Sequence, residues 1–393
     1  MSYLLPTYKR QPISFAKGQG SFLFTADGTP YLDALMGIAV CGLGHCHLRI
    51  TQALSDQAKT LVHTSNLFGI DWQEKAGEKL CHVAGMDKVF FANSGAEANE
   101  AALKMARLFA KKRGQNHARV IVMDHSFHGR TLLTVSATAN PVARDGFFTL
   151  DDDFVRVPFG DITAIEQALN QYDDICAIML EPIQGESGVR VADNGFDFLA
   201  QVRQVCNTHD LLMILDEVQT GNGRTGKYFA YQHSQIKPDI LTTAKGLGNG
   251  FPVGACMTSG QANAIFTYGS HGSTYGGTPL ACRIVNEVID TIHDEQLLDN
   301  VAKTHKILTG IITDNLAKDN VSIRGKGMML GVVLPTDRDI DFSSLVDKAR
   351  DKHRLIINVS GGNIIRLLPA LNMNTADTEE MAYRLVNLIK AQL

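Results

Sequence analysis

The segment Leu211-Leu-Met-Ile-Leu-Asp216-Glu217-Val218-Gln219 decides the fold class, because an uninterrupted apolar run ends there in two carboxylates. Such a run predicts a strand buried on both faces, as in the parallel sheets of α/β proteins. An ionised carboxylate at the end of that strand needs a cation or hydrogen-bond donors, since burying it unpaired is unfavourable. Ligands bind at this edge of open α/β sheets. We therefore expect an α/β protein with a ligand site beside Asp216; the alternative is an Asp that only caps the next turn.

Similar apolar runs on both sides of this segment predict further buried strands, at residues 88–91, 119–123, 175–180 and 239–243. Between them the apolar spacing changes to three and four residues, which indicates helices, most clearly over residues 94–114 and again around residues 381–389. Strands that alternate with helices predict a mainly parallel sheet. We expect a large domain over residues 51–284 and a smaller α+β domain built from residues 1–50 and 285–393.

The composition excludes several classes of partner. The 393 residues carry a formal net charge of −4, so no basic field favours nucleic acid or acidic membranes. The apolar runs are too short to span a membrane and the first residues lack a signal-peptide pattern, so we expect a cytoplasmic protein. The segment Cys41-Gly-Leu-Gly-His45-Cys46-His47 has no second Cys/His cluster at ligand spacing, and no bound metal is expected.

The segment Phe91-Ala-Asn-Ser94-Gly95-Ala96-Glu97 leads from a strand into a helix through a turn of small residues. Ser94 and Glu97 have the spacing of a capping box, in which each side chain accepts a hydrogen bond from a backbone N–H at the helix start. The small residues Gly95 and Ala96 would also let a phosphate approach free amides at the positive end of the helix dipole. The segment is therefore either a capped helix alone or a capped helix that binds phosphate.

The segment Pro238-Asp-Ile-Leu-Thr-Thr-Ala-Lys245 has a single lysine at the end of an apolar strand, just before a glycine-rich turn. A lysine among apolar groups loses proton affinity and becomes an amine nucleophile. The alternative is a lysine whose amine simply reaches solvent. The nearby residues 221–227 fit two nucleotide-binding patterns, but Tyr228 stands where a P-loop has Ser or Thr, and we reject both.

A phosphate-binding turn, an acid at a sheet edge and a strand-end lysine together predict a site for pyridoxal 5′-phosphate. The lysine would bond to the cofactor, the acid would pair with its ring nitrogen, and the helix N-terminus would hold its phosphate.

Nine short motifs extend this pattern along nearly the whole chain. They are Asp33 within Tyr-Leu-Asp, His63-Thr-Ser-Asn-Leu-Phe68, Asn93-Ser-Gly-Ala-Glu-Ala-Asn-Glu-Ala101, Ser126-Phe-His-Gly-Arg130, Glu181-Pro-Ile-Gln-Gly-Glu186, Asp216-Glu-Val-Gln219, Ala244-Lys245-Gly-Leu, Gly272-Ser-Thr-Tyr-Gly-Gly277 and Arg366-x-x-Pro369. In order and spacing the chain resembles the class III pyridoxal-phosphate-dependent aminotransferases, most closely the acetylornithine aminotransferase branch. The resemblance implies an α/β, fold-type I architecture, with a mainly parallel sheet of the seven-stranded type in the large domain. It also implies a homodimer with a shared active site.

The resemblance further implies a role for each matching residue. Lys245 matches the Schiff-base lysine, and Asp216 matches the partner of the pyridine nitrogen. Cofactor contacts are implied for Ser94, Gly95, Ala96, Phe127, Val218, Gln219 and, from the other subunit, Thr274; substrate contacts are implied for Arg130, Glu186, Ser273 and Arg366. Many relatives have Thr where this chain has Ala96, so one hydroxyl contact to the phosphate is missing here. His128 is interpreted as a structural residue.

The implied reaction moves the terminal amino group of N²-acetylornithine, or of a close acylated diamino acid, to 2-oxoglutarate, as in arginine or lysine biosynthesis. An ion pair between Glu186 and Arg366 would hide the arginine while the donor is bound; the alternative is a static salt bridge. Succinylornithine, succinyldiaminopimelate, ornithine, 4-aminobutyrate and diaminobutyrate remain alternative donors. A pyridoxal enzyme of another reaction type and a regulatory relative that only binds ligand remain alternative functions.

Overall fold

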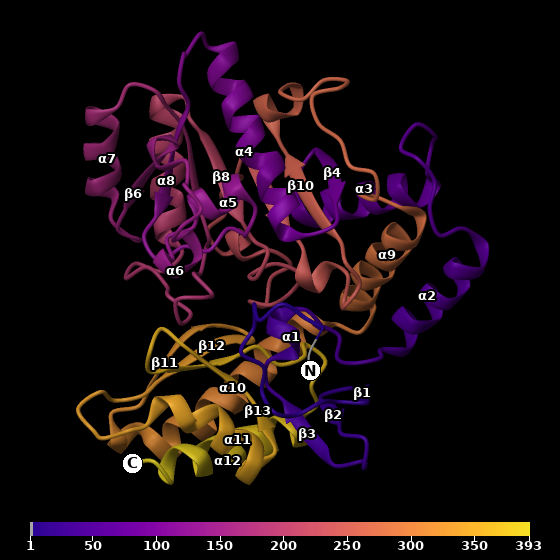
Figure 1. Cartoon of the computed structure of the whole chain (residues 1–393), viewed down its shortest axis with the longest axis vertical. Helices are drawn as coiled ribbons and strands as arrows, with labels where there is room; N and C mark the ends of the chain where they lie inside the picture. The colour runs from indigo at the N-terminus through magenta and orange to yellow at the C-terminus, as the bar shows by residue number, and fades with distance from the viewer. Residues whose placement is uncertain (1–2) are drawn as a thin grey trace.

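The computed structural model describes residues 3–393, and within that range the chain forms one seven-stranded sheet and two four-stranded sheets (Figure 1). The strands of the seven-stranded sheet, in spatial order, are β4 (Lys88–Ala92), β10 (Gly254–Thr258), β9 (Ile240–Thr243), β8 (Leu212–Asp216), β7 (Ile175–Leu180), β5 (Arg119–Met123) and β6 (Phe154–Val157). All pairs from β9 to β6 are parallel, and β10 is antiparallel to both of its neighbours. The mainly parallel sheet predicted from the sequence is confirmed.

Helices cover both faces of this sheet. Helix α4 (Gly95–Lys112) lies on one face, and α3 (Asp71–Ala84), α7 (Ile162–Gln171) and α8 (Asp197–His209) lie on the other. The remaining helices of this part of the chain are α2 (Leu48–Thr60), which packs against α9 (Pro279–Asp294), and the short α5 (Leu132–Ala137) and α6 (Pro141–Arg144). Successive side chains of a strand point to opposite faces, so each strand contributes to two cores. In β8, Met213 and Leu215 pack with residues of α7 and α8, whereas Leu212 and Ile214 pack with residues of α4.

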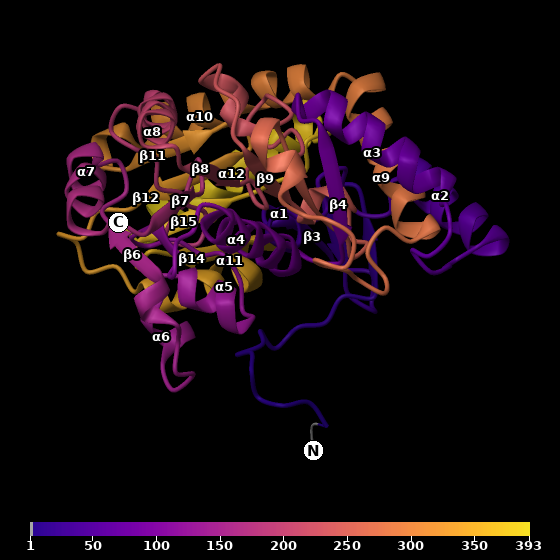
Figure 2. The same cartoon turned by 90° about the horizontal axis from the view of Figure 1, so that it is seen from above.

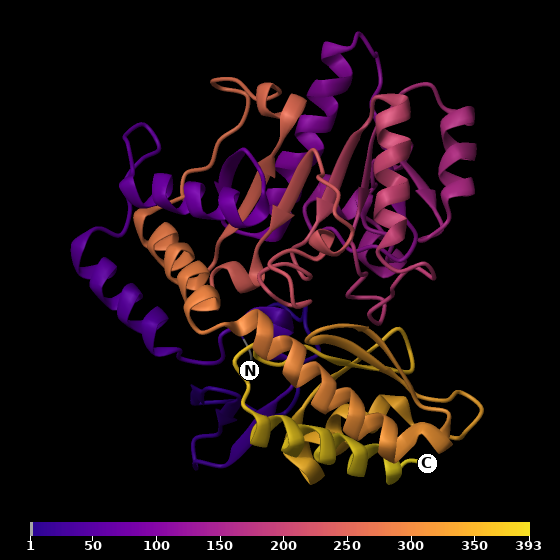
Figure 3. The same ribbon diagram turned by 180° about the vertical axis from the view of Figure 1, so that it is seen from behind.

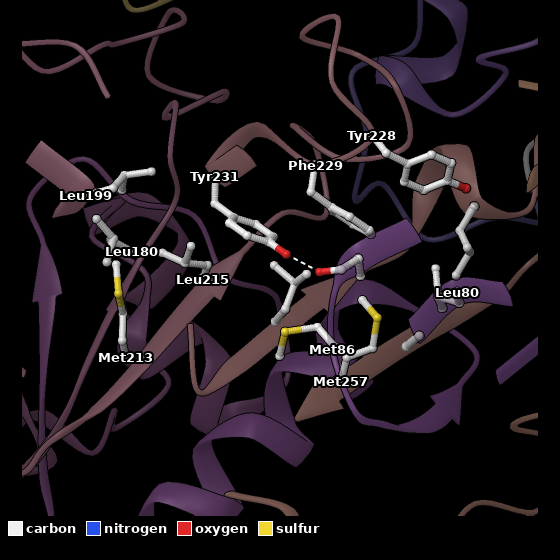
Figure 4. Close-up of a cluster of buried hydrophobic side chains, with 14 of the residues drawn as sticks. Leu80, Met86, Leu180, Leu199, Met213, Leu215, Tyr228, Phe229, Tyr231 and Met257 are labelled. Carbon is white, nitrogen blue, oxygen red and sulfur yellow. Dashed lines mark hydrogen bonds between the residues drawn. The ribbon is translucent and has the colours of Figure 1, made fainter. Parts of the chain in front are cut away.

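Three aromatic side chains that follow residues 221–227 lie in the core that Met213 and Leu215 share with α7 and α8. Figure 4 shows Tyr228, Phe229 and Tyr231 pointing toward methionine and leucine side chains of the sheet and of α3. The hydroxyl of Tyr231 donates to the backbone carbonyl of Ala84. Residues 221–227 are therefore followed by packed aromatic side chains, and no regular helix begins at Lys227.

Two four-stranded sheets lie in the part of the molecule that contains both ends of the chain (Figure 3), and one of them joins strands from both ends. One contains β1 (Lys17–Gln19), β2 (Phe22–Phe24), β3 (Pro30–Asp33) and β13 (Leu355–Ile356); the other contains β11 (Ser322–Lys326), β12 (Met329–Val333), β15 (Ile364–Leu367) and β14 (Asn358–Ser360). The parallel pairing of β3 with β13 brings the early and late segments together. They share a buried cluster with α10 (Leu297–Leu316), α11 (Leu345–His353) and α12 (Thr375–Lys390). The segment before β1 runs away from the body of the molecule (Figure 2).

A left-handed turn, α1 (Met36–Ala39), follows β3. Its four residues have φ angles between 49° and 64°, although only Gly37 is a glycine, and this conformation costs about 1–2 kcal/mol for each other residue. Asp33 holds the start of the turn, because its Oδ1 accepts hydrogen bonds from the amides of Leu35 and Met36. Its Oδ2 lies 2.8 Å from Nε2 of His45. Burial disfavours the imidazolium, but the hydrogen bond and charge of Asp33, together with Cys41, outweigh this effect and raise the pKa of His45 to about 9.

Helices α4 and α12 confirm the two helices expected from apolar spacing, and β4, β5, β7, β8 and β9 confirm the five expected strands. Strands β6 and β10 were not expected. The boundary anticipated between residues 284 and 285 falls inside α9, and the division into domains stays a prediction. Short 3₁₀ turns occupy Asp151–Asp153, Ala230–His233, Lys245–Leu247, Gly260–Ala264, Ala317–Asp319 and Phe342–Ser344. Among residues 3–393, none of the helices has the length and apolar character needed to cross a membrane.

Candidate active site

A cavity of about 430 Å³ opens at the carboxyl ends of β8 and β9. This is the edge of the sheet at which the sequence predicts a ligand site. Nine of the predicted site residues line it: Ser94, Gly95, Ala96, Phe127, Arg130, Asp216, Val218, Gln219 and Lys245. The fold therefore brings together residues that are scattered over more than a third of the chain.

The carboxylate of Asp216 is buried at the end of β8 and is fully surrounded by donors. Its Oδ2 accepts a hydrogen bond of 2.7 Å from Nδ2 of Asn99 and lies 2.8 Å from Nδ1 of His128. Its Oδ1 accepts from the amide of Val218 at 3.0 Å. Asn99 is held in turn by Thr242, whose hydroxyl donates to Asn99 Oδ1 at 2.6 Å. These contacts hold an anion at a fixed position in the floor of the cavity.

The N-terminus of α4 points its free amides at the cavity. Ser94 Oγ accepts from the amide of Glu97, as the capping box requires, which leaves the amides of Gly95 and Ala96 without a helical acceptor. The second half of the predicted box is wrong by one residue, because the carboxylate of Glu97 accepts from the amide of Asn93, not from that of Ser94. Two backbone donors at the positive end of an 18-residue helix suit a phosphate.

Lys245 begins the turn after β9 with a φ of 47°, a left-handed conformation that is uncommon for a residue with a side chain. Among residues 3–393 the structure gives its amine no hydrogen-bond or ion-pair partner. Burial lowers the pKa of Lys245, and the nearby Arg366 lowers it further, while Glu186 opposes both. An unpaired amine with weakened proton affinity is suited to nucleophilic and proton-transfer chemistry.

Phe127, Arg130 and Val218 contribute side chains to the cavity wall. The guanidinium of Arg130 lies 5.2 Å from the centroid of the Phe127 ring, within the range of a cation–π contact. Position 95 requires a glycine for a second reason besides phosphate access, because a Cβ there would lie 2.7 Å from Cγ1 of Val218. The turn before α4 and the segment after β8 are thus in direct contact.

Arg366 of β15 lies behind the cavity wall, with its side chain almost fully buried. Its Nη1 lies 3.1 Å from Oε1 of Glu186 and 3.3 Å from Oε1 of Gln219, which lines the cavity. The same nitrogen donates to the carbonyl of Gly185 at 3.0 Å. The side chain of Glu186 is about one-third exposed (36%), whereas that of Arg366 is 1% exposed. The ion pair expected from the sequence is present, with the carboxylate as its accessible partner.

Ser273 and Thr274 lie outside this cavity. Ser273 Oγ accepts hydrogen bonds from Nδ2 of Asn93 and from the amide of Gly276, and Ser273 lines a separate cavity of about 590 Å³ beside β4. Thr274 is exposed. Within one chain, neither residue reaches the pocket formed by Lys245 and Asp216.

Among the residues of the cavity lining that sequence reasoning missed, two have ionisable side chains. His128, interpreted as structural, contacts Asp216 directly and lines the cavity. Glu181 also lines the cavity, and burial together with repulsion from Asp216 raises its pKa to about 7. Glu181 follows the apolar strand β7 just as Asp216 ends β8, so the rule applied to Asp216 would have found it. His128 carries no comparable signal, because its contact depends on the path of a loop.

The residues present fit pyridoxal 5′-phosphate. The cofactor needs an amine for its aldehyde, an anion for its ring nitrogen and donors for its phosphate. The cavity supplies the unpaired amine of Lys245, the carboxylate of Asp216 and the free amides of Gly95 and Ala96. Backbone geometry positions the amine and the amides, and hydrogen bonds from Asn99, His128 and Val218 position the carboxylate.

Comparison with known proteins agrees with this fit. The profile of the family described as aminotransferase class-III matches residues 4–389. An acetylornithine aminotransferase of Nitrosomonas europaea is 45% identical over 391 residues, which is 99% of this chain and 98% of that protein. An acetylornithine/succinyldiaminopimelate aminotransferase of Yersinia pestis is 40% identical, over 97% of this chain and 94% of that protein. The crystal structure of an ornithine aminotransferase from Toxoplasma gondii superposes with a TM-score of 0.94 at 31% identity, covering 99% of this chain and 93% of that one.

The lowered pKa of Lys245 predicts unusual reactivity in the cofactor-free protein. A larger fraction of its amine is neutral at pH 8 than for a lysine with the usual value of about 10.4. We expect competitive acetylation, followed by peptide mass spectrometry over a pH series, to give Lys245 a titration midpoint clearly below that value. Exposed Lys59 in the same digest reports the behaviour of the reagent. A midpoint in the ordinary lysine range would show that the cavity does not desolvate the amine.

Proposed function

Because the chain belongs to the class III aminotransferases, whose cofactor is pyridoxal 5′-phosphate, we propose that it transfers the terminal amino group of N²-acetylornithine to 2-oxoglutarate. The products are the semialdehyde and glutamate, and the setting is arginine biosynthesis in the cytoplasm. The observation that carries the proposal is the cavity in which unpaired Lys245 shares one pocket with Asp216, the N-terminus of α4 and Arg130.

In this proposal Ser94, Gly95 and Ala96 hold the cofactor phosphate, and Asp216 pairs with the ring nitrogen. Phe127, Val218 and Gln219 contact the ring. When bound, pyridoxal phosphate supplies an electron-accepting ring that stabilises the charge left on a substrate carbon after it loses a proton. The amine of Lys245, with its lowered pKa, would accept that proton and, as the conjugate acid, give it up again to complete the transfer. Asn99 and His128 keep the Asp216 carboxylate in place throughout.

Two arginines divide the recognition of two unlike substrates. The donor presents a distal amine, whereas glutamate presents an amine next to a carboxylate. Arg130 is exposed at the cavity and would take the distal carboxylate of either substrate. Arg366 would take the carboxylate beside the reacting carbon of 2-oxoglutarate by a bidentate contact. With the donor bound, the contact to Glu186 would mask this cation.

We also propose a homodimer in which Thr274 and Ser273 serve the partner's site. The support is an apolar surface beside their loop, where Leu67, Phe68 and Tyr275 are exposed at 87%, 68% and 63%. Asn66 ties this surface to the loop by donating to the carbonyls of Ser273 and Gly276. Exposed apolar groups of this extent mark protein–protein contacts.

A panel of amino donors with 2-oxoglutarate tests the substrate. We expect N²-acetylornithine to have the highest kcat/KM, above succinyldiaminopimelate, succinylornithine, ornithine, diaminobutyrate and 4-aminobutyrate. Lys245→Ala, which lacks the amine, is the control for enzyme-dependent transfer. A higher kcat/KM for ornithine or for succinyldiaminopimelate would identify that compound as the donor and would leave the proposed reaction type unchanged. Absence of transfer from every donor would overturn the proposed function.

Replacement of Asp216 by Asn removes the negative charge while keeping the shape. We expect kcat to fall by about 10³-fold, because the ring nitrogen would lose the anion that keeps it protonated and able to accept the developing negative charge. The cofactor should stay bound through Lys245 and the phosphate contacts, and its absorbance in the purified variant checks this. Turnover close to that of the parent protein would support an Asp that only caps the turn after β8.

Separate measurement of the two half-reactions tests Arg366. We expect Arg366→Ala to slow the 2-oxoglutarate half-reaction about 30-fold more than the donor half-reaction, since only the acceptor uses the free guanidinium. Glu186→Ala should act in the opposite sense and let α-amines compete better with the distal amine. Single-turnover absorbance measures both halves. Equal losses in both halves for both variants would leave only a static salt bridge.

A further inference from the structure

Glu181 is a buried carboxylate that joins two separate loops of the cavity. It directly follows β7 and is 5% exposed. Its Oε1 accepts a hydrogen bond from the amide of Phe127 at 3.0 Å, and its Oε2 accepts from the amide of Gly185 at 3.2 Å. The first amide belongs to the loop after β5 and the second to the loop after β7. One rigid group of two oxygens therefore sets the distance between these loops.

Each of the two loops supports one of the arginines. Phe127 carries the guanidinium of Arg130 over its ring, at 5.2 Å from the centroid. Gly185 offers its carbonyl to Nη1 of Arg366 at 3.0 Å, and the next residue, Glu186, contacts the same nitrogen. Gly185 has no room for a side chain, because a Cβ there would lie 2.2 Å from Oε1 of Gln219. The loop is thus packed on one side by Gln219 and anchored on the other by Glu181.

A carboxylate is a costly choice for this position. Burial and the like charge of Asp216 both disfavour its ionised form, and His128 only partly compensates. An apolar side chain would avoid this cost but would leave two buried amides without acceptors. A charged acceptor holds two N–H groups more firmly than a neutral one. A glutamate at this position therefore gives strong hydrogen bonds of fixed geometry, although burial of its charge is unfavourable.

We infer that Glu181 is a positioning residue that fixes the spacing between Arg130 and Arg366 and thereby selects a dicarboxylate of five carbons. The inference rests on the proposed function, in which these arginines hold the two carboxylates of 2-oxoglutarate. The inference predicts that the protein prefers dicarboxylates of one chain length. A loss of overall stability would not change that preference. A spacing set by two hydrogen bonds is lost when one oxygen becomes an NH₂ group, which cannot accept.

Calorimetric binding of three unreactive diacids to the holoenzyme tests this inference. Succinate, glutarate and adipate carry two carboxylates on chains of four, five and six carbons. We expect the parent protein to bind glutarate most tightly. Glu181→Gln should weaken the binding of glutarate about tenfold, as expected for the loss of one hydrogen bond to a charged group. The variant should then bind adipate and succinate nearly as tightly as glutarate. The same variant should raise the KM for 2-oxoglutarate by a larger factor than the KM for the donor, because the acceptor uses both arginines and the donor uses only Arg130.

Glu217→Gln is the matched control. Glu217 is also a fully buried carboxylate with a pKa raised by burial to about 7, and it also accepts two backbone hydrogen bonds, from the amides of Ala230 and Tyr231. Those amides carry neither arginine, so this variant should lose stability without changing the order of the three diacids. If Glu181→Gln does not fold, Glu181→Asp keeps the charge with a shorter reach and should shift the preferred chain length.

The outcomes separate the inference from the proposed function. A Glu181→Gln protein that keeps the parent's preference for glutarate overturns the inference, whatever its activity. A parent protein that shows no preference among the three diacids also overturns it. Preference for glutarate that is lost in Glu181→Gln supports the inference even if the donor panel shows no amino transfer, a result that overturns only the proposed function.

Discussion

The buried carboxylate of Asp216 is the constraint around which the site is built. A charge with 3% exposure at the end of β8 requires donors from its surroundings, and three separate parts of the chain supply them. Asn99 comes from α4, His128 from the loop after β5, and the amide of Val218 from the following turn. The helix that points free amides at the cavity is thus positioned by the same carboxylate that we propose pairs with the cofactor ring. The groups that we propose hold the cofactor phosphate and the cofactor ring are therefore positioned by one buried carboxylate.

The sequence predicted those parts of the fold in which the local pattern and the burial agree. Strand β7 is apolar throughout and buried along its length, so its pattern is unambiguous. Strand β6 reads Phe-Val-Arg-Val with partly exposed central residues and follows three aspartates, and it was missed. Strand β10 reads Gly-Ala-Cys-Met-Thr, a composition without strong strand preference. It is a strand because it fills the space between β4 and β9, which is a tertiary cause.

The site was predictable to the extent that its chemistry lies at ends of regular elements. Lys245, Asp216 and Ser94 each stand where a strand or helix begins or ends, and they meet in one cavity. The surrounding contacts depend on loops that meet only in three dimensions. His128 was read as structural, and the partner of Glu97 proved to be the amide of Asn93 rather than that of Ser94. Such contacts follow from the exact path of a turn, which spacing in the sequence does not determine.

The parallel pairing of β3 with β13 has a consequence for the synthesis of the protein. Strand β3 pairs early with β2 but gains its second sheet neighbour, β13, only after the whole seven-stranded sheet has left the ribosome. Until then the edge of β3 and the apolar face shared with α10 and α12 stay open to other chains. The catalytic pocket is incomplete during the same interval, since Arg366 lies on β15, later still. Growing polypeptides of this protein therefore carry an open strand edge, a feature that favours aggregation, until β13 has been synthesised.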